Sequence, residues 1–148
     1  MPHVAHANVA RMRAPMGSAA MEAFARAVER INLLAERSPG FVWRFRDEDD
    51  PEAARRVFGA EDLLLNLSVW ETVDALREFT YASGHAHYVK HRKTWFSGPD
   101  GPRYVLWWVA AGHVPSPEES RDRLDHLGAC GPTPEAFTFT HPFDPSTA

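Results

Sequence analysis

The order in which strand-like and helix-like patterns follow one another is the strongest restriction on the fold of this chain. Strand-like alternation of apolar and polar residues occurs at 4–11, 41–46, 63–71 and 103–112. Apolar residues recur every three to four positions, as in a helix, at 19–37, 72–95 and 116–128. The first six patterns have the order β-α-β-β-α-β, which predicts an α+β fold of the ferredoxin-like, split βαβ kind. Such a fold has an antiparallel sheet with helices packed on one face. A short aromatic strand or tail follows the last helix.

Turn and capping residues mark the ends of these patterns. Residues 38–40, Ser-Pro-Gly, end the first helix. Ser116, Pro117 and Glu119 have the spacing of a capping box with proline at the first helical position. The charged run 47–56 predicts an exposed loop between two strands.

One face of the strand at 63–71 is too apolar to lie in water. Its alternate residues are Leu63, Leu65, Leu67 and Val69, which therefore point to the same side. If the helices cover the other face, this one needs a different partner, and a second copy of the sheet is the simplest. The sequence therefore predicts a homodimer that packs sheet to sheet.

Composition restricts the class of protein. The 148 residues predict a single domain, 1–148, without an internal linker. A net charge of −4 and a pI near 6.0 argue against nucleic acid as a partner. The lone Cys130 excludes an intrachain disulfide and a cysteine-based zinc site. No apolar run reaches membrane-spanning length, so we expect a cytoplasmic protein without a membrane partner. Five Trp and nine Phe favour an aromatic core or ligand cavity.

The run 83–96, SGHAHYVKHRKTWF, contains three histidines and raises the question of a metal site. His87 and His91 are four residues apart and share a helix face. The run lacks the glutamate of the H-E-x-x-H motif, and Lys90 would repel a divalent cation. A solvated helix flank is the favoured interpretation, so we predict no metal site.

His85 lies on another face of the same expected helix. It shares that face with Tyr81, Tyr88 and Arg92, a row that can supply proton transfer, anion binding and an aromatic wall. A histidine at the margin of a core is more often only hydrogen-bonded than catalytic. His85 is nevertheless the histidine that we favour as an acid/base group.

The strands add a second polar and aromatic row. Asn66, Ser68 and Trp70 alternate and point to the side opposite the leucines. Asn8 and His6 of the first strand could lie on the same side of the sheet, or they could be exposed residues of an edge strand. We also expect one of the paired indoles, Trp107 and Trp108, to line this helix-side pocket, and we choose Trp107.

Arg44 could hold an anion, although an exposed arginine is the default. In 41–46, strict alternation puts Phe41, Trp43 and Phe45 on one face and Arg44 on the other.

Several stretches along the chain resemble a bacterial family of unannotated function. They are NVARMRAP, SPGFVWR, NLSVWE, WF, LWWVAAGH and GPTPEAFTF, which together span nearly all of it. That family is part of the dimeric α/β-barrel superfamily, which contains the antibiotic-biosynthesis monooxygenases. The resemblance implies a pocket between sheet and helices, with Asn and Trp from the sheet and His from a helix. Carried onto this sequence, it implies Asn8 or Asn66 together with Trp70 and His85, and we choose Asn66, Trp70 and His85 as catalytic residues.

The resemblance and the motifs together leave three hypotheses for function. The first is a monooxygenase-like or related tailoring enzyme that acts on a small aromatic or polyketide-like molecule. It would bind substrate through Asn8, Ser68, Tyr81, Tyr88, Arg92 and Trp107. Because no flavin or nucleotide motif is present, it would use no cofactor, with haem as the alternative. The second hypothesis is a non-catalytic module that binds a small ligand or haem, and the third is a purely structural dimer.

Overall fold

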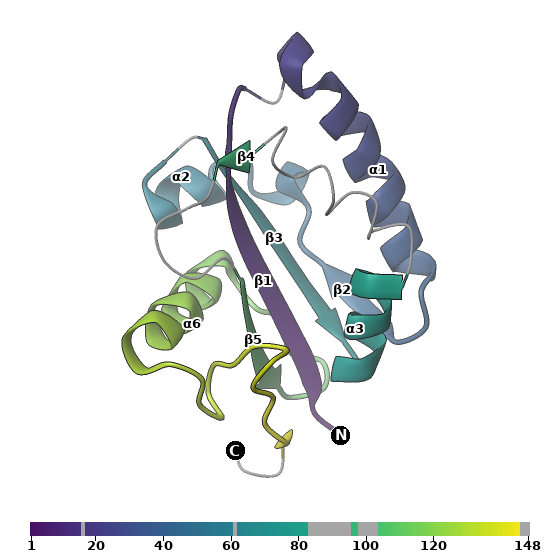
Figure 1. Ribbon diagram of the computed structural model, residues 1–148, viewed down its shortest axis with the longest axis vertical. Helices are drawn as coiled ribbons and strands as arrows, with labels where there is room; N and C mark the ends of the chain where they lie inside the picture. The colour runs from purple at the N-terminus through teal and green to yellow at the C-terminus, as the bar shows by residue number, and fades with distance from the viewer. Residues whose placement is uncertain (16, 61, 83–95, 98–103, 146–148) are drawn as a thin grey trace.

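The computed structural model describes residues 1–15, 17–60, 62–82, 96–97 and 104–145. Its strands are β1 (His3–Met12), β2 (Phe41–Arg44), β3 (Leu63–Trp70), β4 (Phe96–Ser97) and β5 (Tyr104–Val109). Its helices are α1 (Glu22–Arg37), α2 (Ala53–Phe58), α3 (Val73–Ala82) and α6 (Pro117–Cys130), as Figure 1 shows. Single 3₁₀ turns precede α1 at Ala19–Met21 and α2 at Asp47–Asp49.

The sheet confirms the α+β, ferredoxin-like prediction. All pairings are antiparallel, and β1 lies at the centre between β3 and β5. β2 pairs with β3 at one edge, which gives the order β2-β3-β1-β5. The two-residue β4 pairs with the far end of β1, at Arg11 and Met12.

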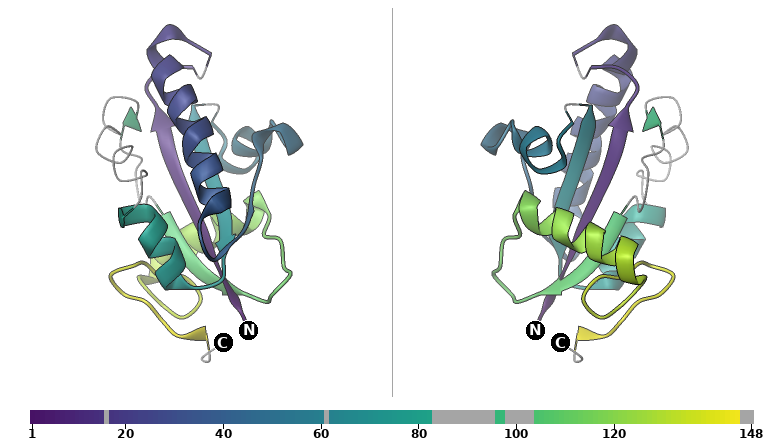
Figure 2. Two further views of the ribbon diagram at one scale, coloured as in Figure 1. Left: turned by 90° about the vertical axis from the view of Figure 1, so that its right-hand side faces the viewer. Right: turned by 90° about the vertical axis from the view of Figure 1, so that its left-hand side faces the viewer.

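The two faces of the sheet are covered by different helices (Figure 2). On one face α1 and α3 pack over the side of the sheet that carries Val4, Trp70 and Leu106. On the other face lies α6, whose Leu124 and Leu127 are buried against the strands. The sequence predicted helices on one face only, and α6 departs from that arrangement because it has its own apolar side chains to bury.

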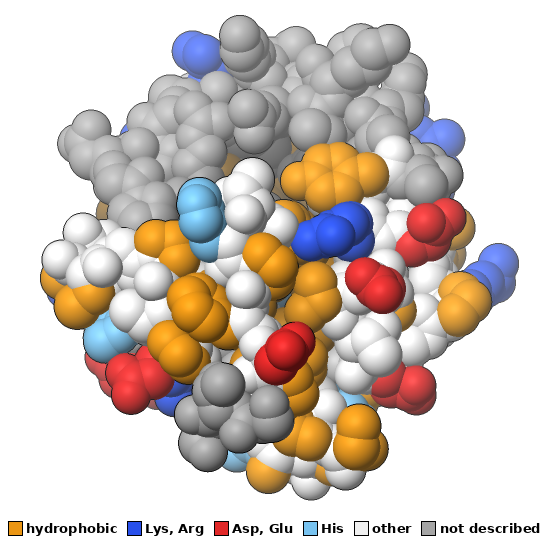
Figure 3. Space-filling view, turned by 60° about the horizontal axis from the view of Figure 1, so that its bottom comes forward, with side chains coloured by type: hydrophobic (Ala, Val, Ile, Leu, Met, Phe, Trp, Pro, Cys, Tyr) orange, Lys and Arg blue, Asp and Glu red, His pale blue; other side chains and the backbone are white. Residues whose placement is uncertain are grey.

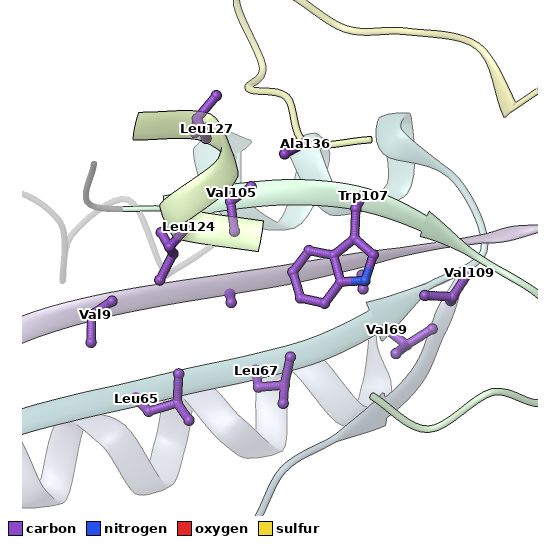
Figure 4. Packing of buried hydrophobic residues seen from close by; sticks show 12 residues of the cluster. Val9, Leu65, Leu67, Val69, Val105, Trp107, Val109, Leu124, Leu127 and Ala136 are labelled. Atoms are coloured by element: carbon purple, nitrogen blue, oxygen red, sulfur yellow. The ribbon is translucent and has the colours of Figure 1, made fainter. Parts of the chain in front are cut away.

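The leucine face of β3 is therefore covered within a single chain. Leu65, Leu67 and Val69 are buried in one cluster with Leu124 and Leu127 of α6. Figure 4 shows Leu124 reaching from α6 toward the strands and the Trp107 indole extending from β5 toward β3. The assumption that this face needs a second copy of the sheet was wrong. The homodimer itself stays a prediction, without that face as its reason.

Local structure confirms most of the predicted boundaries. The Ser116 hydroxyl oxygen accepts a hydrogen bond from the Glu119 amide at 3.1 Å, which caps α6. Thr72 caps α3 in the same way, accepting from the Ala75 amide at 3.0 Å. The run 47–56 was predicted to be a loop, but Ala53–Phe58 forms α2, which buries Ala53 and Val57.

Gly40 connects the end of α1 to β2 in a conformation that favours glycine, with φ +85°. A Cβ atom at this position would lie 2.6 Å from the Ala75 Cβ of α3. The Glu71 amide also donates to the Gly40 carbonyl oxygen at 2.7 Å. The turn before β2 and the start of α3 are therefore in direct contact.

The segment after α6 returns to the sheet beside β5. Leu106 and Phe137 form an isolated antiparallel bridge, and the Trp108 indole donates to the Phe143 carbonyl oxygen at 2.8 Å. Seen from the end where both termini lie, hydrophobic side chains form small groups among polar and acidic ones (Figure 3). Among the described residues, no helix is both long enough and apolar enough to cross a membrane.

Candidate functional site

A pocket of about 100 Å³ lies between the helix-side face of the sheet and helices α1 and α3. Its floor comes from β1, β2 and β3, and its roof comes from one side of each helix. The lining residues are His6, Asn8, Val28, Ile31, Asn32, Ala35, Phe41, Arg44, Phe45, Asn66, Leu67, Ser68, Trp70, Leu76, Phe79 and Thr80.

Polar side chains cross the floor of this pocket in two rows. Arg44 of β2 is the register partner of Ser68 in β3, and Ser68 is the partner of His6 in β1. In the next row, Asn66 of β3 is the partner of Asn8 in β1. Partners in register on antiparallel strands have adjacent side chains on the same face. The antiparallel pairing therefore collects these five side chains from three separate parts of the sequence.

A bulge in β2 places Arg44 in this row. Phe41 is the partner of Trp70, whereas Trp43 is the partner of Val69, and the register shifts between Phe41 and Trp43. Strict alternation predicted Phe41 and Trp43 on one face, but the bulge puts Trp43 against the leucine face. Arg44 therefore shares the pocket face with Phe41.

The floor residues hydrogen-bond to one another. The Asn66 Nδ2 donates to Asn8 Oδ1 at 3.0 Å, which joins β3 to β1. The Trp70 Nε1 donates to Ser68 Oγ at 3.0 Å, two residues back along the same face. These bonds fix the orientation of both amides and of the indole ring.

Aromatic rings form one wall of the pocket. The Trp70 ring stacks on Phe79 of α3 with 5.1 Å between centroids, and Phe41 meets it edge to face at 5.4 Å. Trp70 is fully buried and Phe79 is half-buried. Offset-stacked and edge-to-face rings are favourable arrangements, so the three rings hold one another in place as an apolar wall.

Arg44 supplies the charge of the site. Its Nε donates to the Glu36 carboxylate of α1 at 2.8 Å, and its side chain is 21% exposed. Arg46 lies 3.7 Å from the same carboxylate. The hydrogen bond from Arg44, followed by the charges of Arg44, Arg46 and Arg37, lowers the pKa of Glu36 below its ordinary value of 4.5. Glu36 is therefore ionised at neutral pH and holds Arg44 in place.

A larger and more polar groove adjoins the pocket. It has a volume of about 460 Å³ and lies between α1 and the segment around β2. Five residues line both spaces: Val28, Asn32, Arg44, Phe45 and Asn66. Known ligand pockets of drug-sized molecules span about 300–1,000 Å³. The pocket alone therefore suits a compact ligand, and a larger one would extend into the groove.

Four of the site residues predicted from sequence come together in the structure. Asn8, Asn66, Ser68 and Trp70 all line the pocket, as their alternation along β1 and β3 predicts. Their shared location agrees with the predicted site, and their roles stay a prediction.

The other predicted site residues are not placed in the pocket. Tyr81 is 59% exposed and packs edge to face on Phe139, outside the lining. Trp107 was expected on the pocket side, but it lies on the leucine face, where Glu119 Oε2 accepts from its Nε1 at 2.7 Å. The remaining three predicted residues, His85, Tyr88 and Arg92, lie outside the described residues.

Two residues of the site were weighed in the sequence and set aside. His6 was treated as a strand residue that could be exposed, and Arg44 was given an exposed default. The signal for His6 was its alternation with Asn8, which the structure follows. For Arg44 the single sequence offers no signal, because its face depends on the bulge. Within the described residues, no group of three or more His, Cys, Asp and Glu side chains could hold a metal ion.

Residues 3–148 match a family described as a domain of unknown function, DUF3291. The chain belongs to this family. The DUF3291 match covers nearly the whole sequence, and no curated protein matches the chain in sequence.

Two solved structures resemble this DUF3291 protein. SnoaB from Streptomyces nogalater, described as a cofactor-independent oxygenase, has a TM-score of 0.50 and 18% identity, and covers 78% of this chain and 100% of its own. NE2512 from Nitrosomonas europaea, a protein of unknown function, has a TM-score of 0.52 and 14% identity. The match covers 78% of this chain and 97% of NE2512. At these identities the likeness concerns the fold. The family match confirms the resemblance to a family of unannotated function, and the two structures share the fold expected for it.

Proposed function

We propose that this DUF3291 protein is a cofactor-independent, monooxygenase-like enzyme that acts on a small aromatic molecule in the pocket between the sheet and α1 and α3. The observation that carries the proposal is the pairing of a polar floor with an aromatic wall. Asn8, Asn66 and Ser68 form the floor, and Trp70 with Phe79 forms the wall. The description of SnoaB as a cofactor-independent oxygenase with a similar fold supports the same class of reaction.

The chemistry restricts the substrate. Without a flavin, metal or haem, the substrate must itself reduce dioxygen, so it must be an electron-rich aromatic compound with an ionisable hydroxyl group or an enolisable carbon. Oxidation of an activated methylene group meets this requirement. One oxygen atom of O₂ becomes the new carbonyl oxygen. The other leaves as water with the two hydrogens lost from carbon, and the substrate supplies all four electrons.

The residues of the pocket have distinct roles in this proposal. The amides of Asn66 and Asn8 orient the substrate oxygen and stabilise the negative charge that develops when it loses its proton. Trp70 and Phe79 hold the ring and exclude water. His6 lies beside Ser68 and Asn8 in the floor and is a candidate to move the proton. His85, favoured from the sequence, remains a second candidate for that role.

The test is oxygen consumption with a panel of phenolic and enolisable aromatic compounds under ¹⁸O₂. We expect one O₂ to be consumed per product and one ¹⁸O atom to be incorporated into it. Removing a single positioned hydrogen-bond donor from a site of this kind costs about 10²–10³ in rate, so Asn66→Ala should lose activity on that scale. His6→Gln should also lose activity, whereas His141→Gln, an exposed histidine outside the pocket lining, should retain it.

A result in which no compound is oxidised faster with the protein than without it would contradict the enzymatic proposal. Equal activity in wild type, Asn66→Ala and His6→Gln would place any reaction elsewhere. Product formation without ¹⁸O incorporation would exclude oxygenation.

A second candidate is a non-catalytic module that binds a small aromatic ligand. The observation that favours it is the mutual hydrogen bonding of the floor, where Asn66 pairs with Asn8 and Trp70 pairs with Ser68. Polar groups that satisfy one another need no substrate to complete them. This candidate predicts saturable ligand binding without oxygen uptake. Its haem variant predicts a shift of the Soret band when haemin is added.

A further inference from the structure

The pocket contains one full charge in an otherwise neutral lining. Among the described lining residues, Arg44 alone is formally charged when histidine is neutral. The Arg44 side chain is only 21% exposed, and the other lining residues include the amides of Asn66 and Asn32 and the rings of Phe41 and Phe45. A cation with such neighbours attracts an anion more strongly than an arginine in open solvent does, because less water screens it.

Part of the guanidinium group remains available to a ligand. Glu36 accepts from Nε at 2.8 Å, and among the described residues Nη1 donates only to the Phe45 carbonyl oxygen at 3.5 Å, the limit for a hydrogen bond. In the part of the chain that the structure describes, Nη2 donates to no acceptor. Glu36 lines the groove but not the pocket. It therefore fixes the arginine from the groove side and leaves the Nη1–Nη2 edge for another acceptor.

The charge of Glu36 does not cancel that of the arginines around it. Arg44, Arg46 and Arg37 all act on this one carboxylate. The groove on the far side of Arg44 is lined by Arg46 and by the further carboxylates Glu29, Asp47 and Glu48, so that its carboxylates outnumber its arginines. An anionic group is therefore repelled from the groove and favoured on the pocket side of Arg44.

We propose that Arg44 makes the pocket selective for an aromatic ligand that carries a carboxylate. The planar carboxylate matches the Nη1–Nη2 edge of the guanidinium in bidentate geometry. The ring then lies toward Trp70, Phe41 and Phe79. This inference rests on the proposed function for the aromatic pocket and adds the charge of the ligand, and the bulge in β2 is the feature that brings Arg44 to the site.

The test compares 2-naphthoate with its uncharged amide, 2-naphthamide, as probes of nearly equal size. The indole N–H resonance of Trp70, identified from its absence in Trp70→Phe, reports occupancy of the pocket in an NMR titration. A hydrogen-bonded ion pair with a charged group discriminates strongly, so we expect wild type to bind the carboxylate about tenfold more tightly than the amide. In Arg44→Gln this preference should fall to about twofold or less, with little change in amide binding.

Arg46→Gln is the matched control, because it removes an equal charge near the same carboxylate from a residue outside the pocket lining. It should retain the carboxylate preference. Arg44→Lys keeps the charge but not the planar edge and should give an intermediate preference. If Arg44→Gln is unstable, Arg44→Lys takes its place, and an unchanged carboxylate preference in that variant would count against Arg44.

Each other outcome has a definite meaning. Equal binding of both probes to wild type would overturn the selectivity of Arg44 and leave the aromatic pocket intact. A carboxylate preference that persists in Arg44→Gln would assign the selectivity to another residue. If neither probe shifts the Trp70 resonance, both this inference and the proposed aromatic pocket fail.

Discussion

The polar residues of the pocket floor are engaged with one another, and this determines what a ligand must do to bind. Asn66 donates to Asn8, and Trp70 donates to Ser68. The Trp70 indole is buried, and a buried donor that loses its acceptor costs about 1–3 kcal/mol, so a ligand that displaces Ser68 must replace that hydrogen bond. Asn66 is exposed, so water can replace its bond to Asn8. Arg44 differs from the other floor residues because one edge of its guanidinium can donate hydrogen bonds to a ligand while Nε keeps its bond to Glu36.

The ion pair between Glu36 and Arg44 gives a prediction for stability against pH. The pKa of Glu36 is lowered in the folded protein, chiefly by the hydrogen bond from Arg44. The pair therefore stabilises the fold above the ordinary pKa of 4.5, and this contribution is lost as the pH falls through the lower folded value. We expect Glu36→Gln to unfold at lower urea concentration than wild type at pH 7, and the difference to shrink below about pH 4.5.

The matched control for this prediction is Glu22→Gln, which removes an exposed ion pair with Arg26 from the same helix. Exposed pairs of this kind contribute little, so its urea midpoint at pH 7 should stay close to that of wild type. A difference between Glu36→Gln and wild type that grows toward acidic pH would contradict the predicted sign.

Sequence alone could predict residues whose faces follow from unbroken alternation. Asn8, Asn66, Ser68 and Trp70 are such residues, and the structure places all four in the pocket. Alternation also separates Trp107 from Trp108, but it does not say which of them faces the helices. The choice of Trp107 for the pocket failed because its indole has a partner on the other face of the sheet. Glu119 accepts a hydrogen bond from that indole and also contacts His113 Nε2 at 2.8 Å, and so its carboxylate does not complete the capping box.

At the scale of elements, α6 determines how the second face of the sheet is buried. Its Leu124 and Leu127 lie in one cluster with Leu65, Leu67 and Val105. The hydroxyl of Ser116 and the carboxylate of Glu119 fix its first turn. The strand pattern showed that the leucine face must be covered, but it could not identify the cover, because a second chain and a later helix of the same chain satisfy it equally.

Leu124→Ala tests this assignment. The Leu124 side chain is only 6% exposed. Truncation of such a buried leucine to alanine lowers the free energy of unfolding by about 2–5 kcal/mol. We expect a loss in that range by urea denaturation. Because the cluster lies within one chain, this loss relative to wild type at the same protein concentration should not change with that concentration. Asp122→Ala, on the exposed side of α6, should change the free energy by no more than about 0.5 kcal/mol. A loss relative to wild type that changes strongly with protein concentration would instead indicate burial between chains.

The segment after β2 shows why a short helix can be missed when secondary structure is predicted from sequence. Residues 47–56 are dominated by charge, which is typical of an exposed loop, yet α2 begins at Ala53. Ala53 and Val57 lie one helical turn apart and are both buried. A six-residue helix with two buried residues forms too short a pattern to recognise. Their burial depends on contacts with the next strand, β3, and with α6, which lies far away in sequence.

At the scale of the whole molecule, the fold follows the order of its elements. The predicted order β-α-β-β-α-β specified the antiparallel topology, since few arrangements accommodate it without crossed connections. The homodimer, by contrast, was inferred from a surface that the chain covers itself.

Light scattering tests the remaining dimer prediction. The chain has a mass of 16.6 kDa, so a homodimer would scatter at twice that value, about 33 kDa. We expect the dimer mass for wild type. Because the leucine face is buried within each chain, the dimer interface must then lie elsewhere on the surface. A mass of one chain at all concentrations would exclude the homodimer.

The contact between Gly40 and Ala75 also has a consequence for how the pocket could change during evolution or design. Phe79 belongs to the same helix as Ala75 and stacks on Trp70, so the backbone of the β2 turn limits how far this aromatic wall can be displaced. A side chain at position 40 would lie 2.6 Å from the Ala75 Cβ, so either the turn or α3 would have to shift. Variation at Phe79 or on α1 can reshape the cavity with the backbone unchanged. New ligand specificities are therefore more accessible through the roof of the pocket than through the turn that supports it.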